Sequence, residues 1–95
     1  MVNAIILLNV KREQINTVAE HLVDIEGVSE VYSVAGEFDI AVVVRARDND
    51  TVAELVTKRL LQESGITRSQ TLIAFRTYSR HDLDRIFSLG FEERS

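Results

Sequence analysis

The segment Gly36-Glu37-Phe38-Asp39 places two carboxylates directly after a glycine. Glycine permits a sharp bend, and backbone N–H groups in such a bend can hold an anion. The flanking runs 28–35 and 40–46 are strand-like, so we expect the segment to connect a β-hairpin. Such a loop can present N–H donors and an acid to a small molecule, although turn chemistry alone also explains a lone Gly-x-x-Asp.

Two hydroxyl side chains, Ser69 and Thr71, are the second candidate group for ligand contacts. They are two residues apart on an expected strand, so both project from the same face of the sheet. The alternative is that they form the solvated side of an edge strand.

Patterns typical of catalytic and metal sites are missing from the sequence. His21 and His81 have no carboxylate at triad or metal-ligand spacing, and the chain contains no cysteine. No nucleophile elbow, zinc-protease, P-loop or dinucleotide-binding motif occurs. Glu37 and Asp39 could act as an acid–base pair, but no nucleophile lies near them in the sequence. We therefore expect a protein that is not an enzyme, with no catalytic residue, cofactor or metal.

The composition indicates one globular domain that acts in the cytoplasm. The chain has 95 residues, of which 45% are hydrophobic and 27% charged. A formal charge of −4 and scattered Lys and Arg residues argue against direct DNA binding. The apolar run 4–8 is too short to cross a membrane or to form a signal-peptide core.

Hydrophobic periodicity predicts the element order β-α-β-β-α-β. Apolar runs predict strands over 2–8, 28–35, 40–46 and 68–77. The first helix has an apolar stripe at helical spacing, and we expect it to end at Gly27. The second helix is expected to open with a capping box at 51–54 and to end at Gly65. This order is typical of an α+β ferredoxin-like sandwich whose central strands are the first and the third.

The two central strands are apolar on both faces. A sheet with water on one side should alternate apolar with polar residues, so a second apolar face needs a cover. The simplest cover is a second copy of the sheet, which gives a dimeric α/β barrel by sheet-to-sheet packing. The alternative is that the C-terminal segment folds back over this face, but that segment is short. We expect a domain over 1–78, followed by a C-terminal amphipathic extension over 79–95 that forms a short helix.

Together, Ile25-Glu26-Gly27-Val28, the loop from Gly36 to Asp39, and Ser69-Gln70-Thr71-Leu72 resemble the effector-binding domain of the Lrp/AsnC regulators, also called the RAM domain. The resemblance implies a dimer through the sheets, often in a ring of four dimers (an octamer), with an amino acid bound at contacts between dimers. It implies that the loop from Gly36 through Glu37 to Asp39 contacts the ligand, and that N–H groups near Gly36 receive the ligand carboxylate. It also implies that Asp39 faces the ammonium group, and that Ser69 and Thr71 supply hydroxyl contacts.

The sequence departs from the family pattern at both ends. Its first strand begins at Val2 without a preceding helix-turn-helix, so we expect a stand-alone effector domain that works by mixed assembly with full-length regulators. The expected helix over 80–87 replaces the strand of many relatives. Three alternatives remain open: a monooxygenase-like enzyme of the dimeric α/β-barrel type, an ACT-type regulatory domain, and an assembly module without a ligand.

Overall fold

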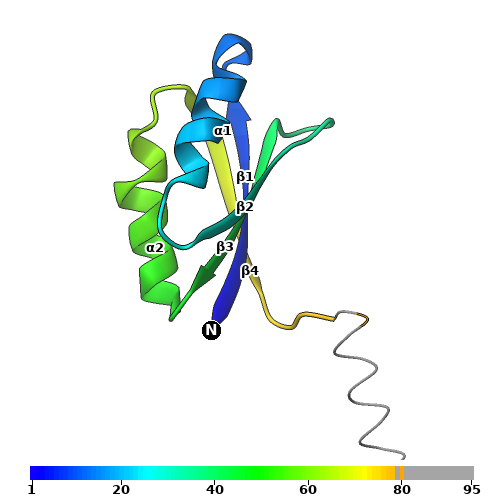
Figure 1. Ribbon diagram of the computed structural model, residues 1–95, viewed down its shortest axis with the longest axis vertical. Coiled ribbons are helices and arrows are strands. Elements are labelled where there is room, and N and C mark those ends of the chain that lie inside the picture. The colour runs from blue at the N-terminus through cyan, green and yellow to red at the C-terminus, as the bar shows by residue number, and fades with distance from the viewer. Residues whose placement is uncertain (79, 81–95) are drawn as a thin grey trace, which may run out of the picture.

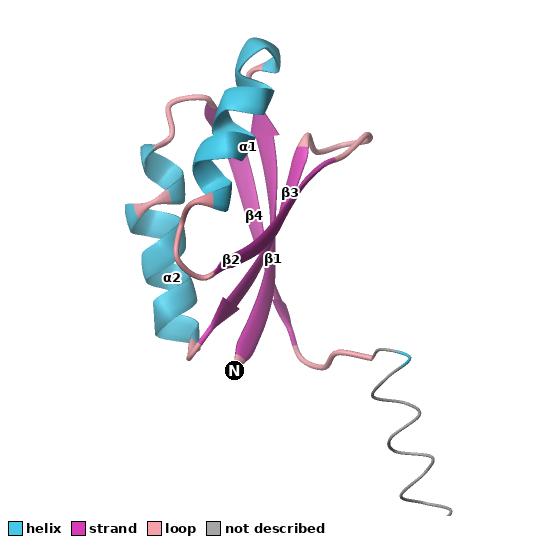
Figure 2. Ribbon diagram, in the orientation of Figure 1, coloured by secondary structure: helices cyan, strands magenta, loops and turns pink. Residues whose placement is uncertain are grey.

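Four antiparallel strands form one sheet, and two helices lie on one of its faces (Figures 1 and 2). The computed structural model describes residues 1–78 and residue 80. The elements in chain order are β1 (Val2–Val10), the 3-10 turn η1 (Arg12–Gln14), α1 (Ile15–Val23), β2 (Val28–Ser33), β3 (Ile40–Ala46), α2 (Asn49–Lys58), the 3-10 turn η2 (Leu60–Gln62) and β4 (Ile66–Ala74). The strand order is β2-β3-β1-β4. The predicted ferredoxin-like fold, with the first and third strands in the centre, is confirmed.

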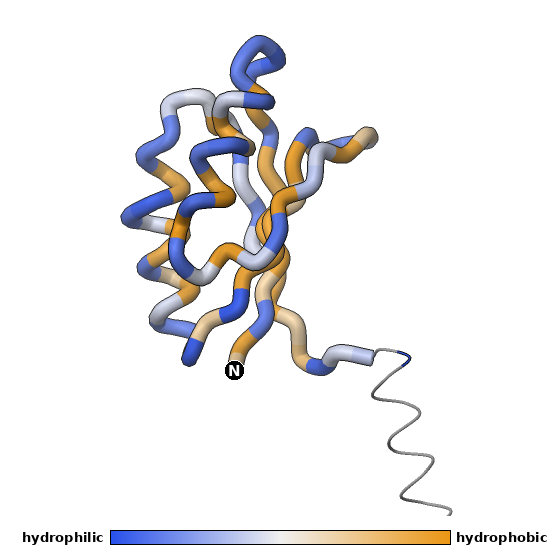
Figure 3. Tube along the Cα trace, viewed as in Figure 1, coloured by the Kyte–Doolittle hydropathy of each residue, from blue (hydrophilic) through white to orange (hydrophobic). Residues whose placement is uncertain are grey.

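The core lies between the sheet and the helices. Every second residue of β1 and of β3 points to this side. Residues paired across the two strands share a face, so the inward residues of β1 lie beside those of β3. The helices cover them with Val18 and Leu22 of α1 and Val52 and Leu55 of α2. Figure 3 shows the result, with hydrophobic colour along the sheet and hydrophilic colour along the outer sides of the helices. The fully buried side chains of the two central strands are Ala4, Ile6, Leu8, Ile40, Val42 and Val44.

The other face of the sheet, here called the open face, is not covered by either described helix (Figure 1). Ile5 and Leu72 are paired across β1 and β4 on this face, and they are 39% and 41% exposed. Further apolar side chains beside them are Leu7, Ala41 and Val43. The prediction that the central strands are apolar on both sides is therefore confirmed.

The start of α2 differs from the predicted capping box at 51–54. Asp48 is the N-cap, and its Oδ1 accepts hydrogen bonds from the backbone N and the Oγ1 of Thr51, at 2.8 and 2.7 Å. Thr51 is therefore the third residue of the helix. Aspartate caps a helix at least as well as threonine, and Asp48 is extended as a cap residue must be.

The two glycines expected to end the helices do not do so. The helix α1 ends at Val23, and Gly27, with a φ of 96°, forms the later turn into β2. The helix α2 ends at Lys58 and is followed by η2, well before Gly65. Gly65 is buried, and a Cβ atom there would lie 3.0 Å from a methyl of Val18 and 2.5 Å from Oε1 of Gln14. Its small size is required by packing against α1, rather than by a helix end.

The chain leaves the sheet after β4 at the same end as the N-terminus (Figure 1). The predicted amphipathic helix lies outside the described residues. Within the part of the chain that the structure describes, no helix has the length and the apolar character needed to cross a membrane.

Candidate functional site

The loop between β2 and β3 projects from the sheet on the side away from the helices (Figure 1). It is closed by a hydrogen bond from the backbone N of Val34 to the backbone O of Asp39, at 2.9 Å. Gly36 has a φ of 131°, a conformation that other residues rarely adopt, and nothing lies within 4 Å of the position of a Cβ atom. The predicted hairpin connection is confirmed, and Gly36 and Glu37 are exposed at its tip.

Asp39 fixes this loop to the end of β1. Its backbone N donates to the backbone O of Leu8, and its Oδ2 accepts from the backbone N of Val10, both at 2.9 Å. The side-chain nitrogen of Asn9 donates to the backbone O of Glu37 at 2.8 Å and lies 3.5 Å from the same Oδ2. The Asp39 carboxylate thus accepts the hydrogen bond that a backbone carbonyl of β3 would accept if β3 extended alongside Val10. Within the described structure, these contacts engage only one of its two oxygens.

Glu37 and Phe38 both contact Arg68 at the start of β4. An Arg68 guanidinium nitrogen (Nη1) lies 3.7 Å from Oε1 of Glu37, and the guanidinium carbon lies 5.0 Å from the centre of the Phe38 ring. The cation therefore has a partner of opposite charge and an aromatic face at the same loop. Sequence reasoning missed Arg68, because in the sequence it is one of many scattered basic residues. Only the pairing of Arg68 with Asn9 in the sheet brings it to this loop.

Ser69 and Thr71 share one face of β4, as predicted, but it is the face on the helix side. They pair with Leu8 and Ile6, whose side chains point into the core. Ser69 is half-buried and Thr71 is exposed, because β4 is an edge strand that the helices leave partly uncovered. Arg68, by contrast, pairs with Asn9 on the open face. One subunit therefore places the loop and the two hydroxyls on opposite sides of the sheet.

The comparisons with known proteins identify the family and the fold of this domain. Residues 3–84 match the family described as the Lrp/AsnC ligand binding domain. The chain belongs to this family. It is 40% identical over 60 residues to an uncharacterised HTH-type transcriptional regulator of Pyrococcus furiosus, a match that covers 63% of this chain and 40% of the relative. The chain thus matches less than half the length of that curated relative.

Solved structures resemble this Lrp/AsnC domain over most of its length. A protein from Thermus thermophilus is 34% identical with a TM-score of 0.79, and the match covers 84% of this chain and 100% of that one. A feast or famine regulatory protein of M. tuberculosis, solved with L-methionine, is 26% identical with a TM-score of 0.71. That match covers 84% of this chain and 54% of the M. tuberculosis chain.

Two other polar contacts of this Lrp/AsnC domain lie away from the loop. His21 has a carboxylate neighbour that is distant in the sequence, since its Nδ1 lies 3.2 Å from Oε1 of Glu63. Their separation of 42 positions in the sequence hid this pair from spacing arguments. On the open face, a hydrogen bond from Tyr32 to Glu30, together with the charge of Glu30, raises the pKa of Tyr32. Among the described residues, no group of three or more side chains could hold a metal ion.

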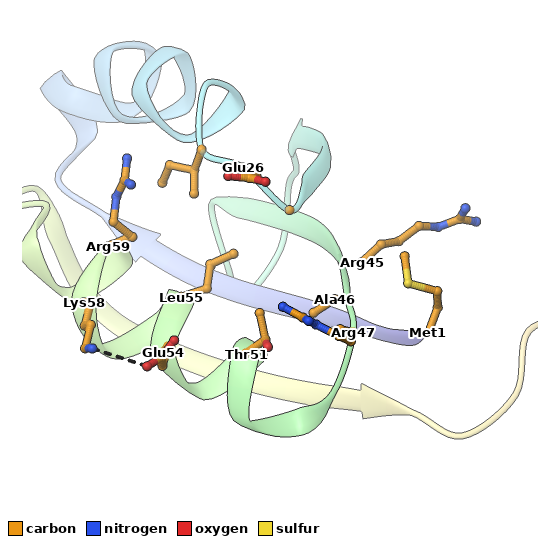
Figure 4. Close-up of a pocket in the computed structure, with 12 residues that line it drawn as sticks. Met1, Glu26, Arg45, Ala46, Arg47, Thr51, Glu54, Leu55, Lys58 and Arg59 are labelled. Atoms are coloured by element: carbon orange, nitrogen blue, oxygen red, sulfur yellow. Dashed lines mark hydrogen bonds and ion pairs between the residues drawn. The ribbon is translucent and has the colours of Figure 1, made fainter.

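A hollow of about 550 Å³ lies at the opposite end of the sheet, between α2 and the turn that leads into β2 (Figure 4). None of the predicted site residues lines it. Its charges do not converge on one point: Lys58 is paired with Glu54 at 3.3 Å, and Figure 4 shows Arg45 directed away from the centre. The Gly36–Asp39 loop is therefore the better candidate for the functional site.

Proposed function

We propose that this domain binds a free amino acid, or a closely related metabolite, as a sensor that does no chemistry on it. The observation that carries the proposal is the loop tip, where Gly36 and Glu37 are exposed while Asp39 and Asn9 hold the backbone in place. A loop with N–H donors and carboxylates suits a zwitterion. Because the loop is already held in place, little conformational entropy is lost when a ligand binds. Family membership and the L-methionine bound to the M. tuberculosis protein support the same ligand class.

In the proposed site, N–H groups near Gly36 receive the ligand carboxylate, and Asp39 faces the ammonium group with its second oxygen. Ser69 and Thr71 supply hydroxyl contacts. Because these hydroxyls lie on the other side of the sheet from the loop, the two groups come from different subunits. Binding is then coupled to assembly, since a complete site exists only at a contact between dimers.

The open face supports assembly as a dimer. Its apolar residues on β1, β3 and β4 form a continuous surface that a second copy would bury. We propose that such dimers form a larger ring and assemble with full-length regulators in the cytoplasm. In this arrangement the domain modulates transcription of amino-acid metabolism without contacting DNA itself.

A thermal-melt screen against the common amino acids at millimolar concentration tests the proposal. A ligand at about a hundred times its dissociation constant adds about 2.7 kcal/mol of stability, which shifts the melting temperature by several degrees for a domain of this size. A selective shift from one or a few amino acids is expected. A flat response across the panel would refute the sensor proposal and favour an assembly module without a ligand.

Substitution of Asp39 by Asn tests whether the ligand binds at this loop. Asparagine keeps an oxygen that can accept from the backbone N of Val10, so the loop should stay in place, but the negative charge is lost. We expect the affinity to fall by about tenfold or more, since a hydrogen bond to a charged group contributes about 1.5–3 kcal/mol. An unchanged affinity of Asp39→Asn would show that the ligand ammonium group does not bind at Asp39.

A further inference from the structure

We propose that Arg68 binds the ligand carboxylate together with the N–H groups near Gly36, and that Glu37 then joins Asp39 around the ammonium group. The inference rests on the proposed function and adds to the site a residue that neither the loop motif nor the hydroxyl pair includes. Both charges of the ligand are then bound where the Gly36–Asp39 loop contacts the first part of β4.

The charge of the loop makes a cation necessary. Glu37 and Asp39 give the loop a charge of −2, so the carboxylate of an amino acid would be repelled by both side chains. The backbone N–H groups near Gly36 carry only partial charges. In the part of the chain that the structure describes, Arg68 is the cationic side chain in contact with this loop. With Arg68 included, each charge of a zwitterion has an opposite charge to meet.

The existing pair between Arg68 and Glu37 is easily opened. The 3.7 Å between the Nη1 of Arg68 and the Oε1 of Glu37 is longer than a hydrogen bond, and the two side chains are 56% and 76% exposed. An ion pair with these features contributes little to stability. A ligand that inserts its carboxylate at Arg68 and its ammonium at Glu37 replaces one loose contact by two charge-assisted hydrogen-bonded ones.

The guanidinium also lies over an aromatic ring before a ligand arrives. The Phe38 ring lies under it at 5.0 Å, and the neighbouring Thr67 is fixed by a hydrogen bond from its Oγ1 to the backbone O of Asn9 at 3.3 Å. The pairing of β1 with β4 shifts register between Asn9 and Val10, next to this position. Such irregularities often aim a side chain at a binding site. A planar guanidinium over an aromatic ring presents two parallel N–H donors, which matches the geometry of a carboxylate.

The test uses L-methionine, or the amino acid with the largest shift in the melt screen, with calorimetric titration of the wild-type chain and its variants. Arg68→Gln removes the charge and should weaken binding by about tenfold or more, while Arg68→Lys should recover part of it. Glu37→Gln should weaken binding to a smaller extent. Arg47→Gln, which removes an exposed arginine at the opposite end of the sheet, is the matched control and should bind like the wild type.

A second ligand separates carboxylate binding from support of the loop. This second ligand is the amine that lacks only the carboxylate of the amino acid tested, which for L-methionine is 3-(methylthio)propylamine. Arg68→Gln should bind the amine as well as the wild type does, as followed by amide chemical shifts of Gly36 and Asp39. An equal loss for the amine and for L-methionine would show that Arg68 only supports the loop, and would overturn the inference. Affinity for L-methionine that is the same in Arg68→Gln as in the wild type would also overturn it, and would leave the sensor proposal standing. A wild-type chain that binds no amino acid would overturn both.

Discussion

At the scale of single residues, Asp39 has a structural role that its position in a loop motif does not reveal. Its carboxylate accepts the hydrogen bond of the backbone N of Val10, a residue that is only 6% exposed. Without this carboxylate, the backbone N–H of Val10 would have no hydrogen-bond partner in the interior of the fold. The Asp39 side chain therefore holds the loop in position and, in the proposed site, also supplies the negative charge that faces the ligand.

This double role predicts different stabilities for two substitutions of Asp39. Asp39→Ala leaves the backbone N of Val10 without its acceptor and should lower the free energy of unfolding by about 1–3 kcal/mol. Asp39→Asn keeps an acceptor and should retain most of the stability. Urea unfolding of both variants without ligand measures the difference. Equal stabilities would mean that water or a rearranged loop satisfies Val10.

Gly65 is the second residue whose role the structure changes, from a helix end to a packing position. A Cβ atom would lie 3.0 Å from the Cγ2 of Val18, which is buried in the core. Gly65→Ala should lower the free energy of unfolding by about 1–3 kcal/mol, the range for overpacked interiors. Ser64→Ala, at the exposed neighbouring position, is the control and should be nearly neutral. A neutral Gly65→Ala would show that α1 can move away from β4 at little cost.

At the scale of elements, the cap of α2 gives a prediction for acid conditions. Hydrogen bonds from the side chain and the backbone of Thr51 hold the pKa of Asp48 below its ordinary value of 3.8. Because the folded-state pKa is lowered, the stabilisation is fully present above the ordinary value and is lost as the pH falls through the folded-state pKa. Asp48→Asn still caps the helix but does not titrate. Its unfolding free energy should therefore fall less steeply than that of the wild type below about pH 4, measured by urea unfolding at several pH values. Parallel curves would mean that Asp48 is not ionised differently in the two states.

The elements also show which features could be predicted from the sequence. The strands and the helix stripes follow from local periodicity, which is why the bounds predicted for β3 match those observed, Ile40–Ala46. Caps are less certain, because Asp48 and Thr51 are both good capping residues and only the backbone conformation decides between them. Contacts between distant segments do not follow from local pattern. Arg68 meets Glu37, and His21 meets Glu63, only because the sheet register and the packing of α1 bring them together.

At the scale of the whole molecule, the sheet has two faces, of which the described helices bury only one. The structure offers a matched pair of residues that tests what the open face does. Leu72 and Ile73 are neighbours on β4, and they are 41% and 40% exposed. They differ mainly in direction, since Leu72 pairs with Ile5 on the open face and Ile73 pairs with Ala4 on the helix side.

A glutamate at each of these two positions should affect assembly differently. In a dimer joined through the open faces, Leu72→Glu buries a charge opposite an apolar surface and should raise the dimer dissociation constant by tenfold or more, about 1.4 kcal/mol. Ile73→Glu places the same charge on the same strand outside this interface and should leave the dimer intact. Sedimentation equilibrium of the wild type and both variants measures the dissociation constants, and circular dichroism checks that each chain is folded. A dimer that tolerates Leu72→Glu but is broken by Ile73→Glu would place the interface on the helix side of β4 and leave the open face without its proposed partner.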